Sequence, residues 1–224
     1  MDWTAIWLSI RLATATAIVL LVIGVPIAWW LSVTKWRLKF LVEAVVALPL
    51  VLPPTVLGFY VLVALGPRGP VGSAFAAVTG GTLAFSFTGL LMASVLYSLP
   101  FAVQPFAAAF GAVDLRLSEA SWTLGLSRAA TFARVVLPLA WPGVLAGLVL
   151  SFAHTLGEFG VVLMVGGNLP GVTRTVSISI YDDVQALDYG SAALTSGVLL
   201  IASFVVLSVT YGLQRRMVSI WLPR

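Results

Sequence analysis

Apolar runs of roughly 20 residues recur along the whole chain, and each is long enough to cross a hydrocarbon layer of about 30 Å as a helix. Hydrophobic residues make up 60% of the chain and charged residues 9%, with a mean hydropathy of +1.08. Soluble domains carry about a quarter charged residues, and a membrane barrel shows alternating strands of about ten residues. The pattern therefore predicts an all-α integral membrane protein. We expect about five transmembrane helices (six are possible), near residues 5–31, 43–65, 83–103, 139–159 and 192–213.

Lysine and arginine residues are divided unevenly between the two sides of these predicted helices. The side with more of them in its short loops is the cytoplasmic one. Two cations, Arg68 and Arg174, fall on the other side, which predicts an outer N-terminus and a cytoplasmic C-terminus. Arg11 lies near the outer end of the first helix, where snorkelling or attraction of an anion explains it. The cytoplasmic cations are Lys35, Arg37, Lys39, Arg116, Arg128, Arg134, Arg215, Arg216 and Arg224.

Three prolines interrupt the second apolar run. Pro49, Pro53 and Pro54 lack a backbone donor, and each ring disturbs the preceding helical turn. Broken backbone at membrane depth is tolerated only where protein or a water-filled cavity satisfies the freed carbonyls. The alternative is an ordinary proline kink. We expect this segment to line a translocation path, with Pro53, Pro54 and Thr55 as candidate lining residues.

The polar segment 114–142 is too charged for lipid and lies between two apolar runs. Leu117, Ala120 and Leu124 recur at helical spacing and supply small and apolar side chains that a partner can bury. Gly125 can adopt a positive φ and reverse the chain. Ser127 is a candidate N-cap for a second helix leading to Pro138 at the membrane, where the next transmembrane helix starts. An ordinary amphipathic loop is the competing interpretation.

Within this segment, the residues from 119 to 138 read E-A-S, three residues, G, nine residues, V, one residue, L-P. The pattern closely resembles the EAA signature of ABC-importer permease subunits, EAA-x3-G-x9-I-x-LP. Ser121 and Val135 are conservative departures from it, and the spacing agrees throughout. The resemblance implies a cytoplasmic coupling loop, about residues 114–138, that docks in a cleft of an ATPase. The coupling residues it indicates are Glu119, Ala120, Ser121, Gly125, Leu126, Val135, Leu137 and Pro138.

The stretches LPLVLPPTVLGFYVLVALGPRGPVG and LGEFGVVLMVGGNLPGVTRTVSISIYDD narrow the resemblance to the molybdate/tungstate branch of these permeases, with sulfate/thiosulfate permeases as the alternative. The resemblance implies the type I ABC importer permease fold over a single domain, residues 1–224, in the cytoplasmic membrane. It also implies a homodimer, two ABC ATPases that use ATP and Mg, and an extracytoplasmic oxyanion-binding protein. No cofactor bound by this chain itself is expected. The chain has no Gly-x4-Gly-Lys-Ser/Thr loop, so a separate ATPase must hydrolyse ATP.

Other polar residues near the apolar runs are candidates for the path. Ser151 and Thr155 offer uncharged donors to an anion, and exposed helix N-termini offer more. Glu158 would repel an anion directly, so a gate contact or, preferably, a structural hydrogen bond is expected. His154 is interpreted as a packed core residue, because no companion ligands stand at metal-binding spacing. Asp182, Asp183 and Asp188 are interpreted as a solvated face or a contact for the binding protein.

Two other functional classes fit less well. An ion-coupled secondary transporter would need an acidic site at mid-membrane or an inverted repeat, and neither is evident. An intramembrane enzyme would need a nucleophile with its base or paired carboxylates at depth, and no catalytic residue is assigned. The chain contains no cysteine, which excludes disulfides, thiolate metal sites and thiol catalysis.

Overall fold

The computed structural model describes residues 1–221, and the regular elements of that part are all helical. For residues 213–221 only the backbone helix is described, so the side chains of Arg215 and Arg216 lie outside the described part, as does Arg224. The elements in chain order are α1 (Trp3–Val33), α2 (Lys39–Val51), α3 (Pro54–Leu65), α4 (Pro70–Thr79), α5 (Phe87–Gly111), α6 (Leu115–Thr123), α7 (Arg128–Thr131), the π-helical turn η1 (Phe132–Val136), α8 (Leu137–Gly157), α9 (Gly160–Gly166), α10 (Val176–Gln185) and α11 (Tyr189–Trp221).

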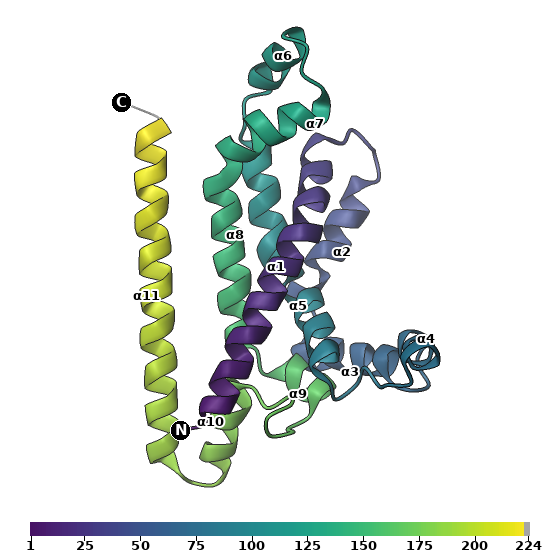
Figure 1. Ribbon diagram of the computed structural model, residues 1–224, viewed down its shortest axis with the longest axis vertical. Helices are drawn as coiled ribbons and strands as arrows, with labels where there is room; N and C mark the ends of the chain where they lie inside the picture. Colours follow the sequence, from purple (N-terminus) through teal and green to yellow (C-terminus); the bar gives the residue numbers. More distant parts are fainter. Residues whose placement is uncertain (222–224) are drawn as a thin grey trace.

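Helices α1, α5 and α8 form the centre of the molecule (Figure 1). Their main apolar core includes Leu20, Phe106 and Val144, each fully buried. Glycines allow the close approach, because a Cβ at Gly24 or Gly147 would lie 3.3 or 2.7 Å from the Phe106 ring. Helix α11 runs along one side of the bundle beside α8 (Figure 1).

Four helices of the described part are long and apolar enough to cross a membrane: α1, the helix from Arg128 to Gly157, α5 and the Tyr189–Gly212 part of α11. The predicted second transmembrane helix is instead divided into α2 and α3, which are bent by 112° at the break and count as a fifth span only if taken together. The break falls at Leu52 and Pro53, directly before Pro54. Pro49 stays inside α2. The expected disruption by prolines is confirmed, and two of the three cause the break.

Two boundaries differ from the sequence prediction. The third span begins at Phe87, where Ser86 caps it by accepting a hydrogen bond from the Gly89 amide, and it ends at Gly111 and not near residue 103. Pro100 and Pro105 therefore lie within the helix. The turn expected over residues 66–72 is shorter, because Pro70 occupies the first turn of α4, a position where its missing donor costs nothing.

The two ends of the bundle carry different structures (Figure 1). The α1–α2 connection, α6 and α7 lie at one end, called here the α6 end. The N-terminus, α9 and α10 lie at the other, called the α9 end, and α11 runs from there toward the α6 end. At the α9 end, Asp2 caps α1 by accepting a hydrogen bond from the Ala5 amide at 3.0 Å, and the Arg11 guanidinium lies 5.1 Å from the centre of the Phe87 ring.

Candidate functional site

Helix α6 ends in a tight reversal at Gly125. Gly125 has a φ of +85°, as the sequence predicted. Its amide donates to the Trp122 carbonyl at 2.9 Å, and the Leu126 amide donates to the Ser121 carbonyl at 3.1 Å. This pair of bonds is the Schellman arrangement, which satisfies the last carbonyls of a helix and needs a left-handed residue after it. The reversal sends the chain directly into α7.

A buried pair of hydroxyls fastens α6 to α7. Ser127 caps α7 by accepting a hydrogen bond from the Ala130 amide at 3.3 Å, as predicted. Ser121 donates to the Ser118 carbonyl at 2.7 Å, so the Thr131 hydroxyl, also 2.7 Å away, donates to Ser121. Both side chains are buried. The third position of the signature therefore holds the two arms of the helix–turn–helix at a set angle.

The prediction that a transmembrane helix starts afresh near residue 139 is wrong. The helix is continuous from Arg128 to Gly157 and passes through the π-helical turn η1. The Leu137 amide bonds to the Phe132 carbonyl, five residues earlier. In a regular α-helix the Pro138 ring would collide with the carbonyl of Arg134, and the wider π turn relieves this collision.

The base of this element is packed into the transmembrane core. The Phe132 ring lies 4.9 Å from that of Trp29 on α1 and 5.6 Å from that of Phe110 on α5, measured between centroids. Val136, one turn later, is 1% exposed within the same core. The helix–turn–helix is thus joined to α1 and α5 by side-chain contacts and to α8 by continuous helix.

Helix α6 exposes several apolar side chains beside its charged ones. Leu117 and Leu124 are 47% and 80% exposed, and Ala120 is exposed between them. Trp122 is also exposed, and the Arg128 guanidinium lies 5.9 Å from its ring. Glu119 is exposed as well. Of the other signature residues, Leu126, Val135 and Leu137 are half-buried and Pro138 is exposed.

The predicted path residues fall into two groups at the α9 end. Pro53, Pro54 and Thr55 are exposed at the α2–α3 break. Pro54 packs against α9, where a Cβ at Gly160 would lie 2.7 Å from the Pro54 Cβ. The break therefore lies close to the C-terminal end of α8, because Gly160 is two residues beyond Glu158.

The second group is buried on α8. Ser151 donates back to the Leu148 carbonyl at 2.9 Å, and Thr155 lies 2.9 Å from the Ser98 hydroxyl of α5. Glu158 is 4% exposed, and neither of its carboxyl oxygens has a hydrogen-bond partner among the described residues. Its backbone carbonyl accepts from the Ser177 hydroxyl at 2.6 Å, which links the end of α8 to α10.

His154 has more contacts than the sequence suggested. Its Nδ1 lies 2.9 Å from the Ser98 hydroxyl. Its ring stacks on Phe101 at 3.9 Å and lies 4.8 Å from the Tyr97 ring, measured between centroids. The interpretation as a hydrogen-bonded residue is confirmed, although the side chain is only half-buried. Within the described residues, no group of three or more His, Asp or Glu side chains is placed to hold a metal ion.

The chain was compared with known proteins and structures. Residues 10–219 match the model of the family described as "Binding-protein-dependent transport system inner membrane component". The chain belongs to this family. It is a permease of the ABC-transporter class and an inner-membrane component.

Two relatives and one solved structure place the permease more closely. It is 53% identical over 214 residues to the molybdenum transport system permease protein ModB of Azotobacter vinelandii, covering 96% of this chain and 95% of the relative. It is 35% identical over 206 residues to the probable sulfate transport system permease protein cysT of Chlorella vulgaris, covering 91% and 77%. A crystal structure of a bacterial alginate ABC transporter, in complex with an alginate pentasaccharide-bound periplasmic protein, contains a chain with a TM-score of 0.77. That match has 17% identity and covers 96% of this chain and 78% of the other, so it supports the fold alone.

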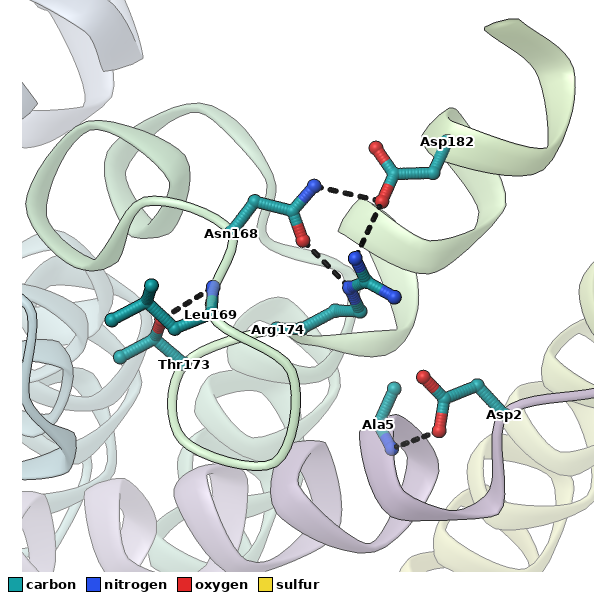
Figure 2. Close-up of polar contacts among 7 residues, drawn as sticks. All are labelled: Asp2, Ala5, Asn168, Leu169, Thr173, Arg174 and Asp182. Atoms are coloured by element: carbon teal, nitrogen blue, oxygen red, sulfur yellow. Dashed lines mark hydrogen bonds and ion pairs between the residues drawn. The ribbon is translucent and has the colours of Figure 1, made fainter. Parts of the chain in front are cut away.

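The loop between α9 and α10 of the permease is held by a charged network (Figure 2). Arg174 donates from Nε to the Asn168 side-chain oxygen at 2.6 Å, and Asn168 donates to an Asp182 oxygen at 2.7 Å. The Arg174 Nη2 lies 3.5 Å from the same Asp182 oxygen. Thr173 donates to the Gly166 carbonyl and accepts from the Leu169 amide. Asp182 is therefore paired and not simply solvated.

Farther along, Asp188 acts as a helix cap. Its Oδ1 accepts a hydrogen bond from the Ser191 amide at 3.1 Å, which lowers the pKa of the Asp188 carboxyl below its ordinary value. This bond satisfies a free amide in the first turn of α11.

Sequence reasoning missed Ser98, Tyr97 and Gln104 on α5. They share no motif, and each is an isolated polar residue in an apolar run. For Tyr97 and Gln104 the available signal was spacing. Together with Phe101 they recur at intervals of four and three residues, which places them on one face of the helix.

Proposed function

We propose that this permease is the membrane subunit of an ATP-driven ABC importer that moves molybdate or tungstate across the cytoplasmic membrane. The observation that carries the transport function is the helix–turn–helix of α6 and α7, which presents an apolar surface and continues without interruption into the membrane helix α8. Exposed apolar patches of this kind mark interaction sites.

The coupling role is assigned to residues 114–138. Leu117, Ala120 and Leu124 enter the ATPase cleft, and Gly125 sets the reversal behind them. Five further residues hold the element together and join it to the bundle: Ser121, Leu126, Val135, Leu137 and Pro138. Glu119 lies on the exposed side, where it contacts the ATPase.

The substrate class rests on the relatives. The molybdenum permease is 53% identical to this chain, and the sulfate permease is 35% identical. A divalent tetrahedral oxyanion is common to both. Sulfate or thiosulfate is the second candidate, and the difference in identity favours molybdate or tungstate.

The working assembly contains two copies of this chain, two ABC ATPases and an extracytoplasmic oxyanion-binding protein. Five spans are few for a complete pathway, which favours a two-fold pair. The chain has no nucleotide-binding loop, so ATP and Mg are used by the ATPases, and this chain binds no cofactor. The whole of 1–224 acts as one transmembrane domain.

The α6 end is assigned to the cytoplasm. Lys35, Arg37 and Lys39 lie in the α1–α2 connection and at the start of α2, at the same end as Arg116, Arg128 and Arg134 (Figure 1). Arg174 lies at the α9 end. This distribution agrees with the positive-inside rule and supports an outer N-terminus and a cytoplasmic C-terminus.

The path runs from the outer end of α8 along the α2–α3 break. Pro53, Pro54 and Thr55 form the exposed part of that break, and Ser151, Thr155 and Glu158 shape the adjoining end of α8. Weak polar lining suits a transporter, because the anion must leave as readily as it enters.

The test is reconstitution of the permease in proteoliposomes with its ATPase and the binding protein. We expect ATP-dependent molybdate uptake that tungstate inhibits more strongly than sulfate. Vesicles without the ATPase serve as the control. Uptake by the permease alone, driven by an ion gradient, would contradict the proposal, and stronger inhibition by sulfate would move the substrate to the second candidate.

A further inference from the structure

Helix α5 carries a stripe of residues that the chain itself leaves uncovered. Tyr97 and Phe101 are half-buried, and Gln104 and Ala108 are exposed, at spacings that place all four on one face. His154 of α8 lies against the outer part of this stripe through its contacts with the two aromatic rings. Both helices are membrane-spanning, so the polar side chains of Tyr97 and His154 are partly exposed, and that of Gln104 is exposed, at membrane depth. Polar groups there face a cavity or protein rather than lipid.

In one arrangement of the protons, a chain of hydroxyls on α8 and α5 leads to the His154 ring. Ser98 has one proton and two neighbours, the Thr155 hydroxyl and the His154 Nδ1, each at 2.9 Å. When Thr155 donates to Ser98 and Ser98 donates to Nδ1, every group is satisfied. The imidazole then carries its proton on Nε2. This nitrogen makes no hydrogen bond to the described residues and is free to donate outward.

We propose that His154, Tyr97 and Gln104 form a transit site for the oxyanion on the pore-facing side of α5 and α8. The inference rests on the proposed function and names residues that bind substrate within it. Each group donates a hydrogen bond without carrying a full positive charge. Hydrogen bonds to an ionised acceptor are strong, yet a neutral site holds a dianion less firmly than a cationic one would.

The chemistry of the surroundings favours an anion over a cation. Glu158, one turn beyond His154, is 4% exposed, so its carboxyl group is inside the fold, although it still interacts electrostatically with Tyr97. No other acidic side chain belongs to the described part of α5 or α8. The carboxylate of Glu43, which shares a cavity with Gln104, lies 3.7 Å from Lys39. His154, Tyr97 and Gln104 can each donate a hydrogen bond to an oxyanion.

The stripe leads to a cavity at the α6 end. The cavity has a volume of about 620 Å³ and is lined by Gln104, Ser32, Lys39 and Glu43 together with apolar residues of α1, α2 and α5. Ligand pockets commonly measure roughly 300–1,000 Å³. Lys39 lies 3.7 Å from Glu43, so the cation is partly neutralised. Gln104 thus belongs both to the stripe and to the cavity through which the anion leaves.

The absence of native cysteine allows a direct test by single-cysteine labelling. His154→Cys and Gln104→Cys are introduced separately and assembled with the ATPase. Each is then treated with an anionic methanethiosulfonate reagent, which enters only water-accessible space. We expect both to react, and molybdate delivered by the binding protein during ATP turnover to slow the reaction. Ile201→Cys on α11, which is 64% exposed and has Val198, Phe204 and Val205 one helical turn away, is the control and should not react.

Uptake measurements give the second readout. His154→Phe keeps the ring stack but removes the donor, and we expect at least a tenfold lower rate of ATP-dependent molybdate uptake with the ATPase activity retained. His154→Gln keeps a neutral donor and should restore most of the uptake. Unreactive cysteines that form disulfides between two copies would overturn the inference and make the face a subunit contact. Wild-type uptake by His154→Phe would also overturn it. Absent uptake by the wild type would instead refute the proposed function, and the labelling would still decide whether the face is open to water.

Discussion

Replacement of Gly125 tests whether the α6–α7 reversal determines docking of the ATPase. Its φ of +85° lies in the left-handed region, and nothing lies within 4 Å of a Cβ built there. The cost of a side chain is therefore one of backbone conformation and not of collision. Left-handed backbone costs an ordinary residue roughly 1–2 kcal/mol. A difference of that size lowers the population of the native turn by a factor of about 5–30.

The assay is co-purification of the ATPase with the tagged permease, followed by the ATP-dependent uptake rate. We expect Gly125→Ala to weaken both, and Gly125→Val to weaken them further, because a β-branched residue is least tolerated at positive φ. Gly125→Asn should be nearly neutral, since asparagine adopts this conformation readily. Membrane insertion should be unchanged in all three, because the turn lies outside the membrane spans.

Gly111→Ala is the matched control. Gly111 ends α5, has an ordinary φ, and has equally open space at its Cβ position. It should therefore leave ATPase binding unchanged. Equal co-purification and uptake for Gly125→Val and the wild type would refute the coupling role. An Asn variant as impaired as the Val variant would refute the conformational explanation.

Three further outcomes follow from the packing. Gly147→Val should destabilise the α5–α8 contact by about 1–3 kcal/mol, because its Cβ would lie 2.7 Å from Phe106. The melting temperature of the purified permease in detergent measures this loss, and an unchanged value would contradict the packing. Arg174→Gln should make the loop of residues 167–175 more sensitive to protease without lowering that melting temperature, since the ion pair at 3.5 Å is partly exposed; equal cleavage would show that the pair does not hold the loop. Thr155→Val should lower the melting temperature, because it breaks a buried hydrogen bond and leaves its partner unsatisfied, which costs about 1–3 kcal/mol. Thr55→Val, at an exposed site, should leave the melting temperature unchanged. Unchanged uptake in both variants would remove these hydroxyls from the proposed path.

Local features with a strong backbone preference could be predicted from the sequence. Gly125 and Ser127 follow from turn and capping chemistry, and the prolines of the second apolar run predict its break. Helix boundaries could not be predicted as well, because apolar composition does not show where a helix emerges from the membrane. This is why α5 was placed too early in the chain.

Features that depend on two distant segments were beyond the sequence. The Pro138 ring can be accommodated in two ways, by a π turn before it or by a helix that starts there. The packing of Phe132 against Trp29 accompanies the π turn. The partners of His154 and Thr155 lie on α5, more than fifty positions earlier. No local pattern identifies Ser98 as the residue that joins them.

The π turn at Phe132–Val136 also has an effect at the far end of the same helix. A π turn amounts to one additional residue in an α-helix, and one residue corresponds to a rotation of about 100° around the axis. Compared with a regular α-helix of the same sequence, each residue beyond the turn, including His154, is therefore rotated by that amount relative to the residues before it. Deleting one residue within the turn would let it close as a regular α-helix and keep the α8 side chains facing α5, whereas a regular α-helix over the full sequence would swing them by about 100°. The helical phase of the membrane segment is thus set next to the α6–α7 reversal, about 25–30 Å from the residues it orients, at 1.5 Å per residue.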